Sequence, residues 1–248
     1  MQIINSLIRW GANRALGPRR VNPAELDRMD FASGLGDGAW LLYGIVRAAK
    51  PQTVVEIGSA QGKSTCYIAA ALSENTRGHL YAIDPHSLTS WNDVGSVETY
   101  TIIQRNLKQA GVAEKVTLLR ETSENVAATW DRPIDVLFID GDHSYDGVKR
   151  DWERFVPHVS SFGFVVFHDT LWDLHPDPKY QRADMGVPRF VEELRRSGYP
   201  VVTINQHYGV SIVQPRRGGV PLSTASEALV DGEATARESE RDVPYAPQ

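Results

Sequence analysis

The chain has 248 residues, of which 42% are hydrophobic and 23% charged, and its formal net charge is −5. This composition is typical of a globular α/β protein, and the acidic balance argues against nucleic-acid binding, which depends on a basic surface that neutralises phosphates. The single cysteine, Cys66, excludes a disulfide within the chain and favours a cytoplasmic location. We expect Cys66 to be an inert packed thiol rather than a nucleophile, because it falls inside a predicted helix.

The first fifty residues predict helices and loops, an N-terminal cap ahead of the first strand. Within them, the glycine-rich stretch 31–40 predicts a loop. No apolar run reaches the roughly 18 residues that a membrane span needs, and the N-terminus lacks the cleavage site of a signal peptide. A helical apolar face near basic residues packs more often on its own domain or a partner subunit than on a membrane surface. That face consists of Ile3, Ile4, Leu7 and Ile8.

From residue 53 to residue 213 the sequence alternates between strand and helix patterns. Apolar runs such as IDVLFID and FGFVVF are typical of strands that are buried on both faces. The predicted strands are residues 53–57, 80–84, 116–120, 134–139, 163–167, 201–204 and 210–213. The predicted helices are residues 63–73, 97–110, 123–130, 147–156 and 187–197.

This alternation indicates an α/β fold with a doubly wound, mostly parallel sheet. The last two predicted strands are joined by the short turn NQHY, so one late strand should run antiparallel. Residues 51–214 are therefore expected to form the main domain. Residues 215–248 are rich in proline, glycine, serine and charge, and they predict a flexible tail.

The stretch VVEIGSAQGKST, residues 54–65, ends like a phosphate-binding loop but has the wrong spacing for one. That loop needs four residues between its glycines, whereas three separate Gly58 from Gly62. A buried strand, a glycine turn and a helix are instead typical of nucleoside- or dinucleotide-binding folds. Asp84 ends the next predicted strand, where an acid typically accepts hydrogen bonds from ribose hydroxyls. Glu56, just before the first glycine, would repel a pyrophosphate but suits a ligand with an amino group.

The segment VEIGSAQG resembles the first motif of the class I S-adenosylmethionine-dependent methyltransferases, with Ala60 where a glycine is usual. The resemblance covers roughly residues 31–213 and implies a Rossmann-like sheet with S-adenosylmethionine as methyl donor. It implies that the glycine turn holds the methionine part, the acid after the second strand the ribose, and the residues after the third strand the adenine. The donor-binding residues so implied are Glu56, Gly58, Ser59, Gly62, Ser64, Asp84, Ser123 (or its neighbour Glu124) and Asp140.

Acidic and imidazole side chains end the next two predicted strands. Asp140 ends the fourth, and His168 and Asp169 end the fifth. Because the carboxyl ends of parallel strands meet at one edge of the sheet, these groups should converge and could hold a divalent cation. The segments DGDHSY and HD resemble metal-dependent O-methyltransferases of the catechol, caffeoyl-CoA and macrocin types, the last most closely.

That resemblance implies Mg²⁺ bound by Asp140 and Asp169. With His168 as a third ligand, the site would prefer a softer metal such as Mn²⁺, or hold none. The candidate general bases are His143 and Asp142. His143 stands at the offset from Asp140 where catechol-type enzymes have a catalytic lysine, and an imidazole accepts protons near neutral pH. The alternatives are that His143 caps the turn before the following helix or that Asp142 or Asp146 is its N-cap. His168 could simply hydrogen-bond the neighbouring strand end.

The connection of residues 171–190 is long, and long loops beside a site often form lids or substrate walls. Its residues Trp172, His175 and Tyr180, together with Trp91 after the second strand, are candidate contacts for the methyl acceptor. A plain surface loop is the alternative.

We predict an O-methyltransferase that acts on a hydroxyl of a small molecule, such as a sugar or a secondary metabolite, with a divalent metal. A metal-independent enzyme with His143 as base is the first alternative. A non-catalytic nucleoside-binding protein and an NAD-dependent oxidoreductase are further alternatives, and Glu56 disfavours the last. No nucleic-acid partner is expected, and a homo-oligomer is left open.

Overall fold

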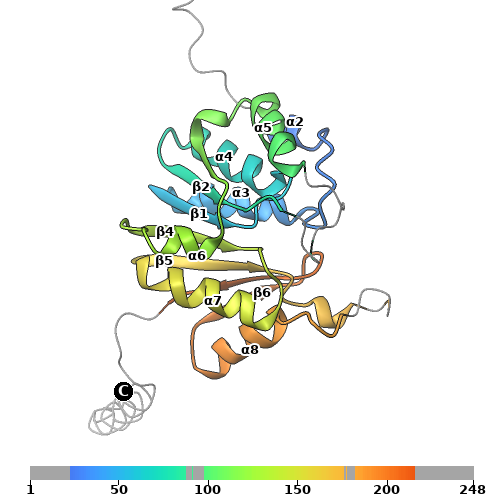
Figure 1. Cartoon of the computed structure of the whole chain (residues 1–248), viewed down its shortest axis with the longest axis vertical. Helices are drawn as coiled ribbons and strands as arrows, with labels where there is room; N and C mark the ends of the chain where they lie inside the picture. The colour runs from blue at the N-terminus through green and yellow to red at the C-terminus, as the bar shows by residue number, and fades with distance from the viewer. Residues whose placement is uncertain (1–22, 88–90, 92–97, 176, 178–181, 216–248) are drawn as a thin grey trace, which may run out of the picture.

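The computed structural model describes residues 23–87, 91, 98–175, 177 and 182–215 (Figure 1). The predictions for the apolar face of residues 3–8, for Tyr180 and for the tail from residue 216 onward lie outside these residues. Among the helices in the described part of the chain, none has both the length and the apolar character needed to cross a membrane.

The described residues alternate between strands and helices. The strands are β1 (Thr53–Ile57), β2 (His79–Ile83), β3 (Val116–Leu119), β4 (Ile134–Ile139), β5 (Val159–His168), β6 (Val201–Ile204) and β7 (Val210–Val213). The α-helices are α2 (Pro23–Leu26), α3 (Gly38–Ala49), α4 (Lys63–Glu74), α5 (Thr99–Ala110), α6 (Ser123–Ala127), α7 (Tyr145–Phe155) and α8 (Val187–Arg196). Short 3-10 helices are η1 (Ala113–Lys115), η2 (Val156–His158) and η3 (Trp172–Leu174).

The strands form one sheet in the order β3-β2-β1-β4-β5-β7-β6. The pairs among β1 to β5 are parallel, whereas β7 runs antiparallel to both of its neighbours, β5 and β6. The prediction of a doubly wound, mostly parallel α/β sheet with one late antiparallel strand is therefore confirmed. The chain order changes direction between β1 and β4, and open α/β sheets bind their ligands at such a switch point.

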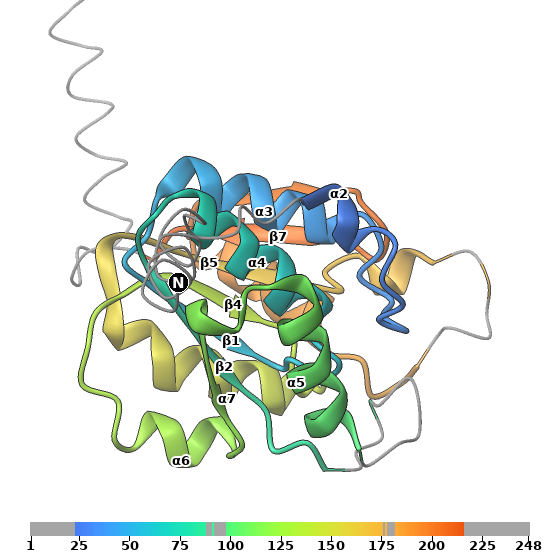
Figure 2. The ribbon, with the colours of Figure 1, turned by 90° about the horizontal axis from the view of Figure 1, so that it is seen from above.

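Helices cover both faces of the sheet (Figure 2). On one face, α3, α4 and α5 form a core in which Leu42 and Ile103 join Val54 of β1. On the other, α6, α7 and α8 form a second core in which Trp152 joins Val55 of β1. The neighbours Val54 and Val55 point to opposite faces because side chains alternate along a strand. With both faces covered, the apolar runs of the central strands are explained.

Many of the predicted bounds differ from the observed ones by one to three residues, and two further differences have a structural cause. Helix α3 begins at Gly38, so the end of the predicted loop 31–40 is helical, because Ala39 and Leu42 are buried in the core that α3 shares with α4. The described residues before β1 therefore pack with the main domain, and a division at residue 51 stays a prediction. Strand β5 begins at Val159, since a register shift after Ile134 lets its first residue pair with β4.

The carboxyl ends of the parallel strands bring four predicted site residues to one edge of the sheet. Gly58 follows β1, Asp84 follows β2, Asp140 follows β4 and Asp169 follows β5. The backbone amides of Gly58 and Asp140 still donate hydrogen bonds to the neighbouring strands, β2 and β1. The start of each loop is thus held by the sheet itself.

Candidate active site

A glycine turn joins β1 to α4 and lies against the end of β4. Gly58 has a φ of +88°, and a Cβ on it would stand 2.1 Å from the carbonyl oxygen of Asp140. Gly62 has a φ of +89°, and its Cβ would stand 2.7 Å from the side chain of Ile103. Any other residue at these positions would meet both backbone strain and a steric clash. Gly58 therefore lets bare backbone lie next to Asp140, and Gly62 lets the other end of the turn lie next to Ile103 of α5.

Asp84 is hydrogen-bonded to this turn. Its Oδ2 accepts from the backbone amides of Ser59 (3.0 Å) and Ala60 (2.8 Å), and its Oδ1 accepts from the amide of His86 (2.6 Å). An ionised carboxylate offers about four lone-pair positions, so the group has room for a further donor such as a ribose hydroxyl. Because its side chain is 16% exposed, such a ligand can reach it.

Glu56 lies fully buried beneath the turn, where the hydroxyl of Ser64 donates to its Oε1. Burial raises the pKa of Glu56 to about 8, against the opposing effect of the Ser64 hydrogen bond. Within the described residues, Oε2 of Glu56 and Oγ of Ser59 are buried and have no hydrogen-bond partner. Buried polar atoms are usually paired, so these two atoms are candidates for contact with a polar ligand.

The raised pKa of Glu56 predicts a pH dependence of stability. Between about pH 5 and pH 8 the folded state keeps a proton that the unfolded state loses, so the free energy of unfolding should fall as the pH rises. The limit is ~1.4 kcal/mol per pH unit for one proton. Glu56→Gln should show a smaller fall over this range in chemical denaturation, whereas Glu114→Gln, at an exposed site, should behave like the parent. Equal slopes for Glu56→Gln and the parent would contradict the assignment.

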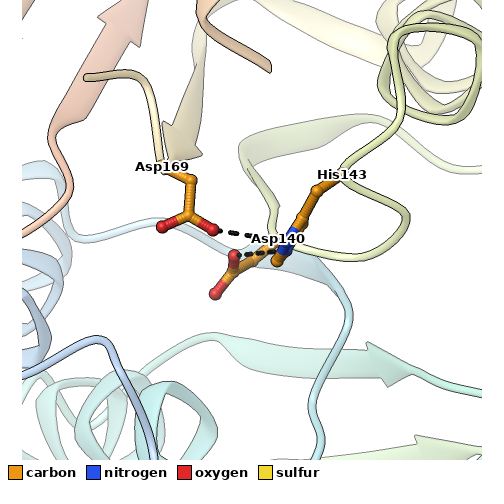
Figure 3. A group of neighbouring side chains, drawn as sticks. All are labelled: Asp140, His143 and Asp169. Atoms are coloured by element: carbon orange, nitrogen blue, oxygen red, sulfur yellow. Dashed lines mark ion pairs between the residues drawn. The ribbon is translucent and has the colours of Figure 1, made fainter. Parts of the chain in front are cut away.

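Asp140, His143 and Asp169 point toward one another at the ends of β4 and β5 (Figure 3). Nε2 of His143 lies 3.3 Å from Oδ1 of Asp140, and Nδ1 of His143 lies 3.4 Å from Oδ2 of Asp169. Nδ1 of His168 also approaches both carboxylates, at 3.3 Å from Asp140 and 3.2 Å from Asp169. Two imidazoles and two carboxylates from adjacent strands therefore form one cluster.

The donor set of this cluster fits a divalent metal. One ligand atom each from Asp140, His143 and Asp169 lie within 4.8 Å of one another. Metal–ligand bonds to oxygen and nitrogen are about 2.0–2.2 Å long, so these three atoms would have to move together only slightly to bind one ion. This group contains His143, whereas the predicted set contains His168, which is the last residue of β5 and 5% exposed. Because His168 approaches the same two carboxylates, the predicted metal set stays a prediction. An imidazole among carboxylates suits Mn²⁺, Fe²⁺ or Zn²⁺ better than Mg²⁺.

The electrostatics of the cluster favour charge separation. Burial alone would raise the pKa of Asp140, but His168 and His143 outweigh it and lower that pKa to about 2. Burial opposes the charged imidazolium of His143, yet its hydrogen bond to Asp140 and the charges of Asp169 and Asp140 raise its pKa. The resting cluster thus pairs carboxylates with an imidazole that holds its proton more tightly than usual.

Two predicted residues make their contacts away from this cluster. Asp142 is 44% exposed, accepts from the amide of Ser144 and lies 3.4 Å from Arg150, so it orders the start of α7. Ser123 donates a hydrogen bond to Asp151 across α6 and α7 (2.6 Å). The N-cap of α7 is Ser144, so the prediction that Asp142 caps this helix is wrong, and its role as base stays a prediction.

Aromatic side chains surround the cluster. The ring of Trp91 lies 5.0 Å from that of His143, and the guanidinium of Arg182 lies 3.7 Å above Trp91. Trp172 stacks on Tyr208 at 4.2 Å, and His175 lies 5.6 Å from the same ring. The described candidate acceptor contacts therefore lie on two loops that border the site.

Three residues near the site were not predicted from the sequence. His86 binds Asp84 through its amide and is 3% exposed. Asp151 is buried, and burial raises its pKa to about 6. Gly186 donates its amide hydrogen to the carbonyl oxygen of His143 at 2.8 Å. Of these three residues, only Gly186 has a local signal in the sequence. It directly precedes the Val-Pro pair that begins a predicted helix, and a glycine at such a place can indicate a close approach of two backbone segments.

Residues 55–170 match a family model described as a methyltransferase domain. An uncharacterized protein of Sinorhizobium fredii is 30% identical over 139 residues, which are 53% of this chain but 15% of that protein. This chain therefore spans only a small part of that relative's length.

Two solved structures share the fold. The methyltransferase PaMTH1 of Podospora anserina, bound to S-adenosylhomocysteine, has a TM-score of 0.59 and 17% identity, covering 85% of this chain and 87% of that one. The O-methyltransferase TomG of Streptomyces achromogenes, involved in tomaymycin synthesis and solved with S-adenosylmethionine, has a TM-score of 0.57 and 19% identity, covering 80% and 88%. Residues 55–170 thus match a methyltransferase domain model, and the two solved methyltransferases share the fold of this chain.

Proposed function

We propose that this chain transfers a methyl group from S-adenosylmethionine to a hydroxyl of a small molecule, such as a sugar or another secondary metabolite, with the help of a divalent metal. One observation carries the proposal. The glycine turn lies directly against Asp140, whose carboxylate belongs to the cluster with His143 and Asp169. The expected donor site and a group of proton-accepting side chains thus share one edge of the sheet.

The donor subsite follows from the contacts of the turn. Gly58 and Gly62 leave room for the methionine part, and the unpartnered polar atoms of Ser59 and Glu56 lie beneath it. Asp84 would accept the ribose hydroxyls. Ser64 acts through Glu56, since its hydroxyl is bound there. Ser123, after β3, would lie on the adenine side, as the resemblance implies.

His143 is the proposed general base. It would remove the hydroxyl proton of the acceptor through a ring nitrogen, and the acceptor oxygen would attack the donor's methyl carbon in line with the carbon–sulfur bond. That bond breaks, its electron pair stays on sulfur, and the products are the methyl ether and S-adenosylhomocysteine. The raised pKa of His143 favours its protonated form, whereas a base must be neutral before it accepts a proton. A positive charge nearby would lower this pKa and so favour the neutral imidazole.

Asp140 and Asp169 would hold the metal, with His168 as the third ligand, which leaves His143 for the proton transfer. A bound divalent cation would lower the pKa of the acceptor hydroxyl. Residues 51–214 would form the catalytic domain, with a cytoplasmic location and no nucleic-acid partner. A metal-independent enzyme is the second candidate. It is favoured by the close contacts of His143 with both carboxylates, because these would stabilise the imidazolium that forms when His143 accepts the proton.

A methyl-transfer assay tests the function. With tritiated methyl donor and a panel of phenols, catechols and sugars, we expect label on a hydroxyl oxygen of at least one acceptor. His143→Gln should slow the transfer by about 100-fold or more, the usual contribution of a general base. Loss of turnover in EDTA, restored by Mn²⁺, supports the metal, and full turnover in EDTA supports the second candidate. Transfer at the parent rate by His143→Gln would contradict both.

A further inference from the structure

We infer that Gly186 is a positioning residue for His143. The connection between β5 and α8 holds this histidine through one contact at each end of the connection. The inference concerns where His143 lies, and it rests on the proposed function only for the statement that this position matters in catalysis. Gly186 directly precedes α8 and lies far from His143 in the sequence. Its backbone amide nevertheless donates to the His143 carbonyl oxygen at 2.8 Å.

The approach of the two segments is too close for a side chain at Gly186. A Cβ there would stand 2.0 Å from the backbone nitrogen of Tyr145 and 2.3 Å from its Cα. The φ of Gly186 is −117°, a value that any residue can adopt, so backbone conformation does not demand glycine. The atoms in the way belong to backbone rather than to a flexible side chain, so any larger residue must push α8 away from the loop that carries His143.

Helix capping does not explain this glycine either. Gly186 is the N-cap of α8 and makes no side-chain cap, although serine, threonine, asparagine or aspartate at such a position stabilises a helix. A chain under no other constraint would gain from one of these residues. The close contact with Tyr145 is the feature that excludes them all.

The other end of the connection holds the ring of the same histidine. Asp169, directly after β5, lies with its Oδ2 3.4 Å from Nδ1 of His143. Asp169 itself has a φ of +59°, a left-handed conformation that aspartate tolerates better than most residues. From the same connection, Arg182 stacks 3.7 Å above Trp91, whose ring lies 5.0 Å from that of His143. The backbone of His143 is therefore fixed by Gly186, its ring nitrogen by Asp169, and its ring face through Trp91.

A small displacement of His143 matters because proton transfer requires a donor–acceptor distance of about 2.6–3.2 Å. An alanine Cβ at residue 186 must gain more than an ångström of space from the Tyr145 backbone, which adjoins the His143 loop. Binding of the methyl donor should not be affected by this change. The glycine turn and Asp84 belong to β1 and β2, whereas the contact joins the β4 loop to α8.

The experiment compares Gly186→Ala with Gly44→Ala. Gly44 lies in α3, and a Cβ there would meet nothing within 4 Å, so the control makes the same chemical change without a clash. Ring nitrogen–proton NMR spectra would be recorded at one pH, with His143→Gln assigning the His143 signals among the seven histidines. We expect Gly186→Ala to shift or broaden the His143 signals, Gly44→Ala to leave them unchanged, and both variants to bind S-adenosylhomocysteine like the parent.

Unchanged His143 signals in a folded Gly186→Ala protein would overturn the inference. If this variant does not fold, as judged by its melting temperature, Pro188→Gly replaces it, because this change loosens the start of α8 without adding bulk near Tyr145. Broadened His143 signals in Pro188→Gly then support the inference, and parent-like signals refute it. Failure of S-adenosylhomocysteine to bind the parent would instead count against the proposed function and leave the positioning result standing.

Discussion

Replacing Asp84 by alanine is expected to abolish detectable binding of S-adenosylhomocysteine. The change removes the acceptor for the amides of Ser59 and Ala60 and the expected acceptor for the ribose hydroxyls. Hydrogen bonds to a charged group contribute about 1.5–3 kcal/mol each, so the loss of two should weaken binding by about 100-fold or more. Isothermal titration calorimetry of the parent and the variant measures this directly.

Two further variants make this result specific. Asp84→Asn keeps one acceptor oxygen but loses the charge, and we expect an intermediate affinity. Asp131→Ala removes a carboxylate that is 81% exposed and paired only at 3.5 Å with Arg132 among the contacts of the described residues. It should bind like the parent. If Asp84→Ala binds S-adenosylhomocysteine as tightly as Asp131→Ala does, the donor subsite has been assigned to the wrong edge of the sheet.

The second large effect is expected for Asp140→Asn, which should lose binding of Mn²⁺. Asp140 is one of the two carboxylates that both His143 and His168 approach, and its pKa is lowered to about 2, so it is ionised and ready to bind a cation at neutral pH. Asparagine offers a similar shape without the charge. Titration of Mn²⁺ followed by electron paramagnetic resonance should show a loss of affinity of about 100-fold, the upper end of what removal of even a supporting ligand costs.

Asp146→Asn is the matched control for this experiment. Asp146 lies in the first turn of α7 and is exposed, so the same loss of one carboxylate at this site should leave Mn²⁺ binding unchanged. Equal Mn²⁺ affinity in Asp140→Asn and Asp146→Asn would remove the metal from the proposal. The second candidate, in which His143 acts without a metal, would then be the account to pursue.

Much of the fold could be predicted from the sequence because burial on both faces leaves a strong pattern. The run at residues 134–139 has the bounds of β4 as predicted, since a central strand needs apolar side chains toward both helical layers. The antiparallel strand could also be predicted from a local feature, because the short turn before Val210 joins the last two strands. The start of β5 was missed because a register shift at Ile134 depends on pairing with another strand, which the local sequence does not encode.

The site was predicted in outline and missed in detail. The carboxyl ends of neighbouring strands had to meet, so Asp140 and Asp169 could be brought together from the strand pattern alone. That His143 joins His168 beside these carboxylates depends on the path of the loop after β4, where the distant Gly186 is hydrogen-bonded to the His143 carbonyl oxygen. The same loop orders Asp142 toward Arg150 rather than into the cluster.

The most direct test of the central claim is a crystal structure of the protein with S-adenosylhomocysteine and MnCl₂, recorded with anomalous scattering from manganese. We predict the ribose on Asp84, the methionine part along Gly58 and Gly62, and one manganese peak between Asp140 and Asp169, with the sulfur facing the metal. Nucleoside bound at any other edge of the sheet, or sulfur facing away from His143, would contradict a methyl transfer at this site.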